Sequence, residues 1–153
     1  MIEWLMPGLD AYRMLGHLRD LVLAYLLAIP SAWDREVRHR AVGLRTFPLV
    51  AVAACGYALI GFSVLESDDA QARIMQGLIT GIGFIGGGAI LKDGGSVKGT
   101  ATAASLWATG AIGLSVAAHR FEIAILVSVA TFLTLRYLKP LMDASESPGK
   151  SGE

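Results

Sequence analysis

The chain has 153 residues, of which 54% are hydrophobic, and its mean hydropathy of +0.54 is too high for an ordinary water-soluble domain. Its net charge of +0 at pH 7 gives no global electrostatic reason to expect nucleic acid as a partner. Short charged segments separate long apolar runs, which predicts an all-α membrane protein, a polytopic bundle of about five transmembrane helices.

The first expected span covers residues 17–33. Its uncharged centre is short, so Arg19 or Asp20 should lie at the membrane interface or in a site lined by protein. Pro30 is expected to kink or end this helix.

A basic loop over residues 34–46 is expected next, followed by a second span over residues 46–65, which carry no formal charge. Glu66, Asp68 and Asp69 then form an acidic connection. Such carboxylates can bind magnesium, but we favour the simpler reading of a solvated loop whose acids cap the next helix.

The third expected span, residues 74–91, has no charge, yet six of its eighteen residues are glycine. Two glycine pairs are spaced four apart, a pattern that lets transmembrane helices approach until their backbones touch. These pairs are Gly77 with Gly81 and Gly83 with Gly87. A polar and small stripe along the same helix is expected to face protein, and it consists of Gln76, Thr80, Gly83 and Gly87.

Two nucleotide-binding patterns fail their context test. Residues 81–86 match G-x-G-x-x-G, and residues 98–100 contain a transposed form of the end of a phosphate-binding loop. Neither follows a predicted strand, so we expect no nucleotide and no cofactor.

After a turn over residues 92–98, a fourth span is expected over residues 99–118 and a fifth over residues 121–138. The fourth carries small and hydroxyl residues at helical spacing, and should pack against the glycine-rich span as a hairpin. These residues are Thr102, Ser105, Thr109 and Gly113. Trp107 lies mid-span and is expected to fill a glycine-lined notch.

The basic residues are distributed unevenly between the two sides of such a bundle. With the N-terminus outside, nine of the thirteen lie on the cytoplasmic side, which favours an N-out, C-in orientation. We divide the chain into an N-terminal segment (1–16), a transmembrane domain (17–140) and a disordered tail (141–153).

Several motifs, in order, resemble the MgtC/SapB membrane proteins over about residues 17–138. They are Gly43-Leu-Arg-Thr46, residues 81–91, Val97, Gly99, Thr100, residues 102–104, residues 106–109 and residues 111–114. The family often has Glu-Arg-Glu where this chain has Asp34, Arg35 and Glu36, so Asp34 is a conservative stand-in. Longer members carry a soluble C-terminal domain, and the chain resembles a short form without it.

The resemblance implies a multi-pass protein of the bacterial inner membrane, linked to magnesium homeostasis and, in some members, to virulence. We expect a non-enzymatic accessory or regulatory factor, because the three histidines lack ligand-like partners. The alternative is a small channel or transporter for Mg²⁺ or another cation, lined by polar residues of the third and fourth spans. Expected partners are the lipid bilayer, another inner-membrane protein and a second copy of the chain, with no nucleic acid and no metal site.

The candidate functional and packing residues come from these patterns. The resemblance adds Arg45, which either caps carbonyls or pairs with Asp34 or Glu36. The basic loop around it either docks another membrane protein or anionic lipid, or only sets topology. The full set is Asp34, Arg35, Glu36, Gly43, Arg45, Thr46, Arg73, Gln76, Thr80, Gly83, Gly87, Thr100, Thr102, Ser105, Trp107 and Thr109.

Overall fold

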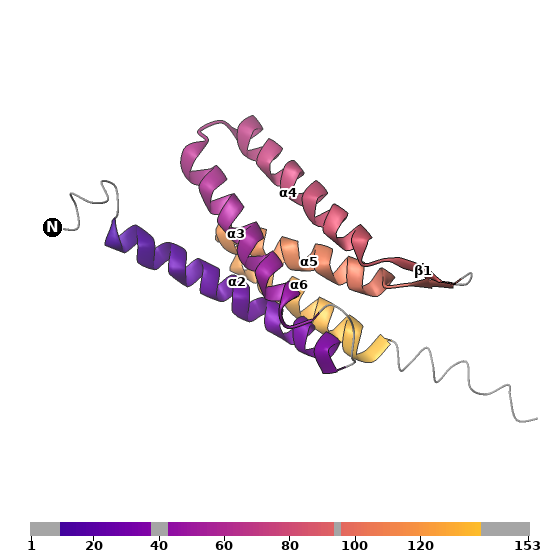
Figure 1. Ribbon diagram of the computed structural model, residues 1–153. Coiled ribbons are helices and arrows are strands. Elements are labelled where there is room, and N and C mark those ends of the chain that lie inside the picture. Colours follow the sequence, from indigo (N-terminus) through magenta and orange to yellow (C-terminus); the bar gives the residue numbers. More distant parts are fainter. Residues whose placement is uncertain (1–9, 38–42, 94–95, 139–153) are drawn as a thin grey trace, which may run out of the picture.

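The computed structural model describes residues 10–37, 43–93 and 96–138, which form a bundle of five helices and one small β-hairpin (Figure 1). The expected fold class, an all-α polytopic bundle, is confirmed. The helices are α2 (Ala11–Val37), α3 (Thr46–Val64), α4 (Asp68–Gly88), α5 (Thr100–Ala117) and α6 (Phe121–Leu133), which continues into the π-helical turn η1 (Thr134–Leu138). Strands β1 (Leu91–Asp93) and β2 (Ser96–Lys98) pair antiparallel.

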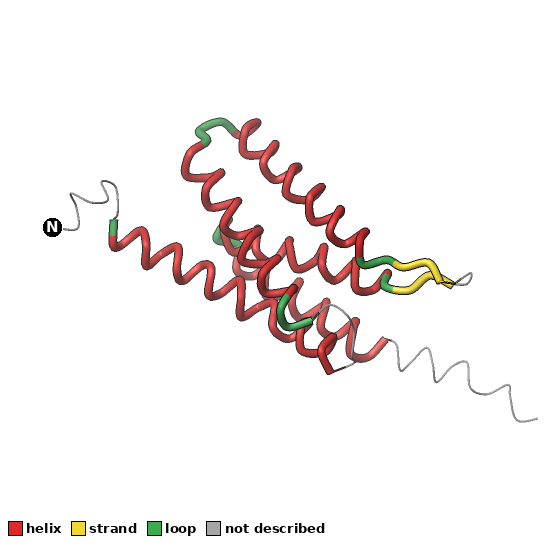
Figure 2. Tube along the Cα trace, in the orientation of Figure 1, coloured by secondary structure: helices red, strands yellow, loops and turns green. Residues whose placement is uncertain are grey.

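Helix α5 is the centre of the bundle, since it packs against α2, α3, α4 and α6. Its buried residues are distributed around the helix and are mostly small, as a helix surrounded by neighbours requires. Figure 2 shows α4 lying apart from α2 and α6, so that α4 forms one edge of the bundle.

Most of the buried apolar residues in this bundle are small, and many large apolar residues are exposed. Along α2, Ala24, Ala28 and Ala32 are fully buried at a spacing of four, whereas Leu18 and Leu26 are exposed. Close helix packing through small residues, with large apolar side chains turned outward, is expected where the surrounding solvent is lipid. The arrangement is therefore that of a membrane protein.

Four of the helices are long and apolar enough to cross a membrane: α2, α3, α5 and the combined α6 and η1. Helix α4 begins with two aspartates and is rich in glycine, and it is not among those four. It nevertheless runs beside α3 and α5 over 21 residues, about 31 Å at the α-helical rise, so its middle lies at the depth of its neighbours.

The first helix differs from the prediction at both ends. It begins at Ala11, six residues before the expected start, and it continues seven residues beyond Pro30, so the expectation that Pro30 ends it is wrong. Proline is tolerated within membrane helices because neighbouring groups can satisfy the carbonyl that it leaves free. The expected basic loop is consequently shorter, and its first residues, 34–37, belong to α2.

The connection between α3 and α4 is exposed, as predicted, but a serine rather than one of the acids caps α4. Ser67 is the N-cap of α4 and accepts a hydrogen bond from the Ala70 amide at 3.3 Å, while Asp68 and Asp69 occupy the first turn. Acids at this position interact favourably with the helix dipole.

Helix α4 ends at Gly88 rather than continuing to residue 91, because the chain turns into the β-hairpin. Gly99 closes this hairpin in the left-handed conformation, at φ 92°. A Cβ atom at Gly99 would collide with the Ala89 carbonyl oxygen, so the two ends of the hairpin connection approach within backbone contact. The following residue, Thr100, starts α5. The predicted hairpin of the third and fourth spans is therefore confirmed.

Candidate functional site

One end of the bundle gathers basic residues from α2, the start of α3, both strands of the β-hairpin and η1, because the antiparallel helices return to it repeatedly (Figure 1). We call it the basic end, and its members among the described residues are Arg35, Arg45, Lys92, Lys98 and Arg136. The opposite end carries the acidic connection between α3 and α4. The positive-inside rule predicts that the basic end faces the cytoplasm.

Asp34 anchors a buried charge cluster at the basic end. It is 4% exposed, and its Oδ1 lies 3.9 Å from Nη1 of Arg136, which belongs to the π-helical turn η1. Arg35 is also buried, at 6% exposure. Charges at this burial require compensation, so the cluster ties the end of α2 to the end of α6.

Glu36 of α2 contacts the Gly43 motif, which leads into α3. Glu36 Oε2 accepts a hydrogen bond from the Leu44 amide at 3.2 Å, and the Gly43 carbonyl accepts from the amides of Thr46 and Phe47. A Cβ atom at Gly43 would collide with the Glu36 carboxylate. The sequence motif therefore has a structural role, in which a carboxylate from α2 satisfies an amide at the start of α3.

Arg45 behaves differently from the predictions made for it. Arg45 is exposed at the N-cap position of α3. Its side chain forms neither an ion pair nor a hydrogen bond with any described residue. The expectation that Arg45 pairs with Asp34 or Glu36 is therefore wrong. Its neighbour Thr46 is the first residue of α3 and is partly buried.

The polar stripe of α4 faces away from the other helices, so no helix of the described bundle supplies the protein surface that was expected to cover it. Its members Gln76, Thr80, Gly83 and Gly87 are all exposed, and a Cβ atom at Gly83 or Gly87 would have nothing within 4 Å. Gly spacing shows that close approach is possible but does not say which neighbour makes it. Arg73, one turn before the stripe, is also exposed.

The α4–α5 contact uses other residues of the two helices. Gly86 lies against the backbone of α5, and a Cβ atom added to it would be 3.1 Å from the Ala103 carbonyl oxygen. Ile82 packs onto Gly110. The hydroxyls of α5 are buried and satisfied within the helix: Ser105 Oγ donates to the Thr102 carbonyl at 2.9 Å and Thr109 Oγ1 donates to the Ser105 carbonyl at 2.8 Å.

Two further residues of α5 lie on its surface. Trp107 is 54% exposed, so the prediction that it fills a glycine-lined notch is wrong. Thr100 is exposed at the first position of the helix. The predicted site residues therefore divide into the basic end, the outward stripe of α4 and the buried hydroxyls of α5, which do not converge on one site.

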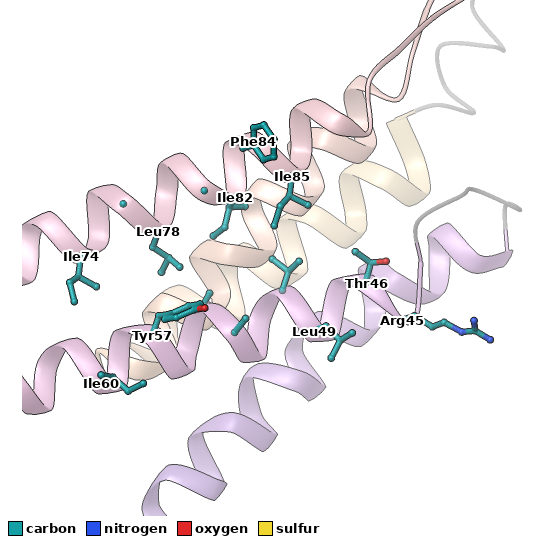
Figure 3. A pocket seen from close by; sticks show the side chains of 15 residues that line it. Arg45, Thr46, Leu49, Tyr57, Ile60, Ile74, Leu78, Ile82, Phe84 and Ile85 are labelled. Carbon is teal, nitrogen blue, oxygen red and sulfur yellow. The ribbon is translucent and has the colours of Figure 1, made fainter.

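A groove of about 820 Å³ lies between α3 and α4 (Figure 3). Apolar side chains from both helices line most of it, including Leu49, Ile60, Leu78 and Ile85. Arg45 and Thr46 lie at the end of the groove that belongs to the basic end. Within the described ranges, no group of three or more histidine, cysteine, aspartate or glutamate side chains is placed so that it could hold a metal ion.

Asp20 is 2% exposed and pairs with Arg19 at 2.8 Å, in agreement with the expectation that Arg19 or Asp20 lies at the interface or in a site lined by protein. Two other contacts were not predicted from the sequence. Ser128 donates a hydrogen bond of 2.6 Å to the Leu27 carbonyl and joins α6 to α2. Gly113 packs directly on the backbone of α3. Gly113 had a sequence signal, its helical spacing from Thr109, but that signal predicted packing against the glycine-rich span rather than against α3.

Comparison with known proteins gives consistent matches. The sequence model of the MgtC family matches residues 21–144. Protein MgtC of Brucella abortus is 36% identical over 80% of this chain and 51% of its own length. An uncharacterized protein of Synechocystis is 38% identical over 79% of this chain and 51% of its own length. Protein MgtC of Salmonella typhimurium is 35% identical over 76% of this chain and 49% of its own length.

The chain spans about half the length of these curated relatives. No solved structure matches it significantly. The family match covers α3, α4, α5 and α6 completely, together with most of α2, and so includes the basic end and the outward stripe. The chain is therefore a membrane protein that belongs to the MgtC family.

Proposed function

We propose that this protein is a non-enzymatic accessory or regulatory factor in magnesium homeostasis, and that it acts by binding another protein of the bacterial inner membrane. The observation that carries the proposal is the outward direction of the polar stripe on α4. The link to magnesium comes from the family, and the mode of action comes from this surface.

The depth of Gln76 is the main argument for a protein partner. Gln76 lies eight residues after the start of α4, about 12 Å along the helix axis, and is therefore well inside the bundle's length. Gln76 is exposed, and its side-chain amide forms no hydrogen bond with any described residue. An amide facing hydrocarbon without a partner is costly, whereas a neighbouring helix can supply hydrogen bonds.

The rest of the stripe suits close contact with such a helix. Thr80 already donates its hydroxyl to the Gln76 carbonyl at 2.8 Å, and Gly83 and Gly87 leave space beside the backbone. A partner helix with small residues of its own can therefore approach α4 closely. The same stripe accommodates a second copy of this chain, which we retain as a possible partner.

The channel alternative is less well supported by the arrangement of polar residues. Gln76 and Thr80 lie on the outer surface of α4, but Thr102 is buried on α5, with 7% exposure. A single copy therefore does not place these side chains around one path. A pore would require several copies whose α4 stripes face one another.

Ion flux measurements distinguish the two functions. We expect the purified protein in liposomes to give no more Mg²⁺ or K⁺ flux than empty liposomes, because a single copy does not place Gln76, Thr80 and Thr102 around one path. A channel would instead give reproducible flux that decreases on Gln76→Leu or Thr80→Val, and this result would replace the regulatory proposal.

A further inference from the structure

The groove between α3 and α4 has the shape and polarity of a site for an amphiphile. Its apolar lining extends along α3 from Leu49 to Ile60. From Arg45 to Ile60 there are fifteen residue steps, about 22 Å at the α-helical rise. This length exceeds half the thickness of a bilayer's hydrocarbon core, about 15 Å. A lipid acyl chain therefore fits along it.

The ends of the groove differ in charge. Arg45 lies at one end, exposed and with no ion pair within the described residues, and Lys92 is exposed at the same end of the bundle. The far end approaches the acidic connection that contains Glu66 and Asp68. An anionic head group is attracted to the first end and repelled by the second.

We propose that this groove binds one anionic phospholipid, with an acyl chain between α3 and α4 and its phosphate at Arg45. The glycines of α4 make room for the chain, since Gly77 and Gly81 line the groove and a Cβ at either would have nothing within 4 Å. Tyr57 and Phe84 flank it with half or more of their side chains exposed. Arginine suits the phosphate because its guanidinium can donate two hydrogen bonds to it.

The lipid site is separate from the proposed partner surface. Gly81 lines the groove, whereas Gly83 lies on the outward stripe, and both are exposed glycines of the same helix. Substitution of Gly81 therefore tests the groove, and the same substitution of Gly83 is its control. Failure of the lipid proposal would leave the regulatory proposal unaffected.

Native mass spectrometry of the detergent-purified protein tests the proposal. Phosphatidylglycerol and phosphatidylcholine with identical acyl chains are added separately, and the apparent affinity for each is measured. We expect tighter binding of phosphatidylglycerol, and we expect Arg45→Gln to lower its affinity about fivefold. The affinity for phosphatidylcholine should fall less, because its choline cation offsets the charge of the phosphate. Arg120→Gln, at the opposite end of the bundle, should leave both affinities unchanged.

A second pair of variants tests the acyl-chain contact. Gly81→Leu should weaken the binding of both lipids by filling the groove, and Gly83→Leu should have no effect on either. Thermal melting in detergent checks that both variants are folded. Equal binding of the two lipids by the wild type, or equal effects of Arg45→Gln and Arg120→Gln, would overturn the proposal. Dimers that exclude lipid would also overturn it, because a second copy would then occupy the groove.

Discussion

Replacing Gly113 with alanine is expected to lower the free energy of unfolding by about 3 kcal/mol, the upper part of the range for overpacked interiors. The added Cβ would collide with the Ala51 carbonyl oxygen and would lie 2.9 Å from the Cys55 nitrogen. Both atoms belong to the α3 backbone, so no change of rotamer can relieve the contact. The central helix α5 would have to separate from α3.

Two other glycines provide the controls for this prediction. At Gly110 a Cβ would meet only the flexible end of Ile82, so Gly110→Ala should cost less, because that side chain can rotate. At Gly81 nothing lies within 4 Å, and Gly81→Ala should cause no loss. Chemical unfolding in detergent micelles measures the change in the free energy of unfolding for each of the three variants. Equal losses at Gly113 and Gly81 would show that α5 does not pack on α3 as described.

Replacing Asp34 with alanine is expected to cost about 3 kcal/mol, near the lower limit for breaking a buried ion pair. The substitution removes the carboxylate beside Arg136 and leaves Arg35 buried, at 6% exposure, in a more positive cluster. The lower limit applies because the Arg136 side chain is 52% exposed and can reach solvent. The end of α2 should consequently separate more easily from η1.

Asp34→Asn isolates the contribution of charge, because it keeps the size of the side chain. We expect it to cost nearly as much as Asp34→Ala. Glu122→Ala removes an exposed acid from the first turn of α6, at the opposite end of the bundle, and should cost under about 1 kcal/mol. If Asp34→Ala and Glu122→Ala had the same effect on the unfolding midpoint, Asp34 would have no special structural role.

The number and order of helices could be predicted from the sequence because a bilayer allows few alternatives. Uncharged runs of about twenty residues gave α3 and α5 to within two residues at each end. Helix α4 begins at Asp68, six residues before the expected start at residue 74, because Ser67 caps it and two aspartates, which are favourable at helix N-termini, form its first turn.

The contacts between helices could not be predicted in the same way. Both α4 and α5 contain small residues four apart, but only the three-dimensional arrangement decides that Gly113 meets α3 while Gly83 remains exposed. Pro30 gave a misleading helix end for a related reason. The cost of a proline inside a membrane helix depends on whether neighbouring groups satisfy the backbone carbonyl that it leaves free, and a local sequence pattern does not specify those groups.

The charged motif also required the structure for its interpretation. Asp34, Glu36 and Arg45 are close in sequence, and pairing among them was a reasonable expectation. Because α2 continues through residue 37, Asp34 instead meets Arg136, more than one hundred residues later in the chain. Arg45 is left at the mouth of the groove.

Photo-crosslinking in native membranes tests most directly whether the outward stripe of α4 binds a protein. A photoreactive amino acid is placed in turn at Gln76, Thr80 and Gly83 on the stripe, and at Ile85 in the groove as a comparison. We predict a protein adduct of one discrete mass from the three stripe positions, and lipid adducts from Ile85. Lipid adducts alone at all four positions would contradict the account.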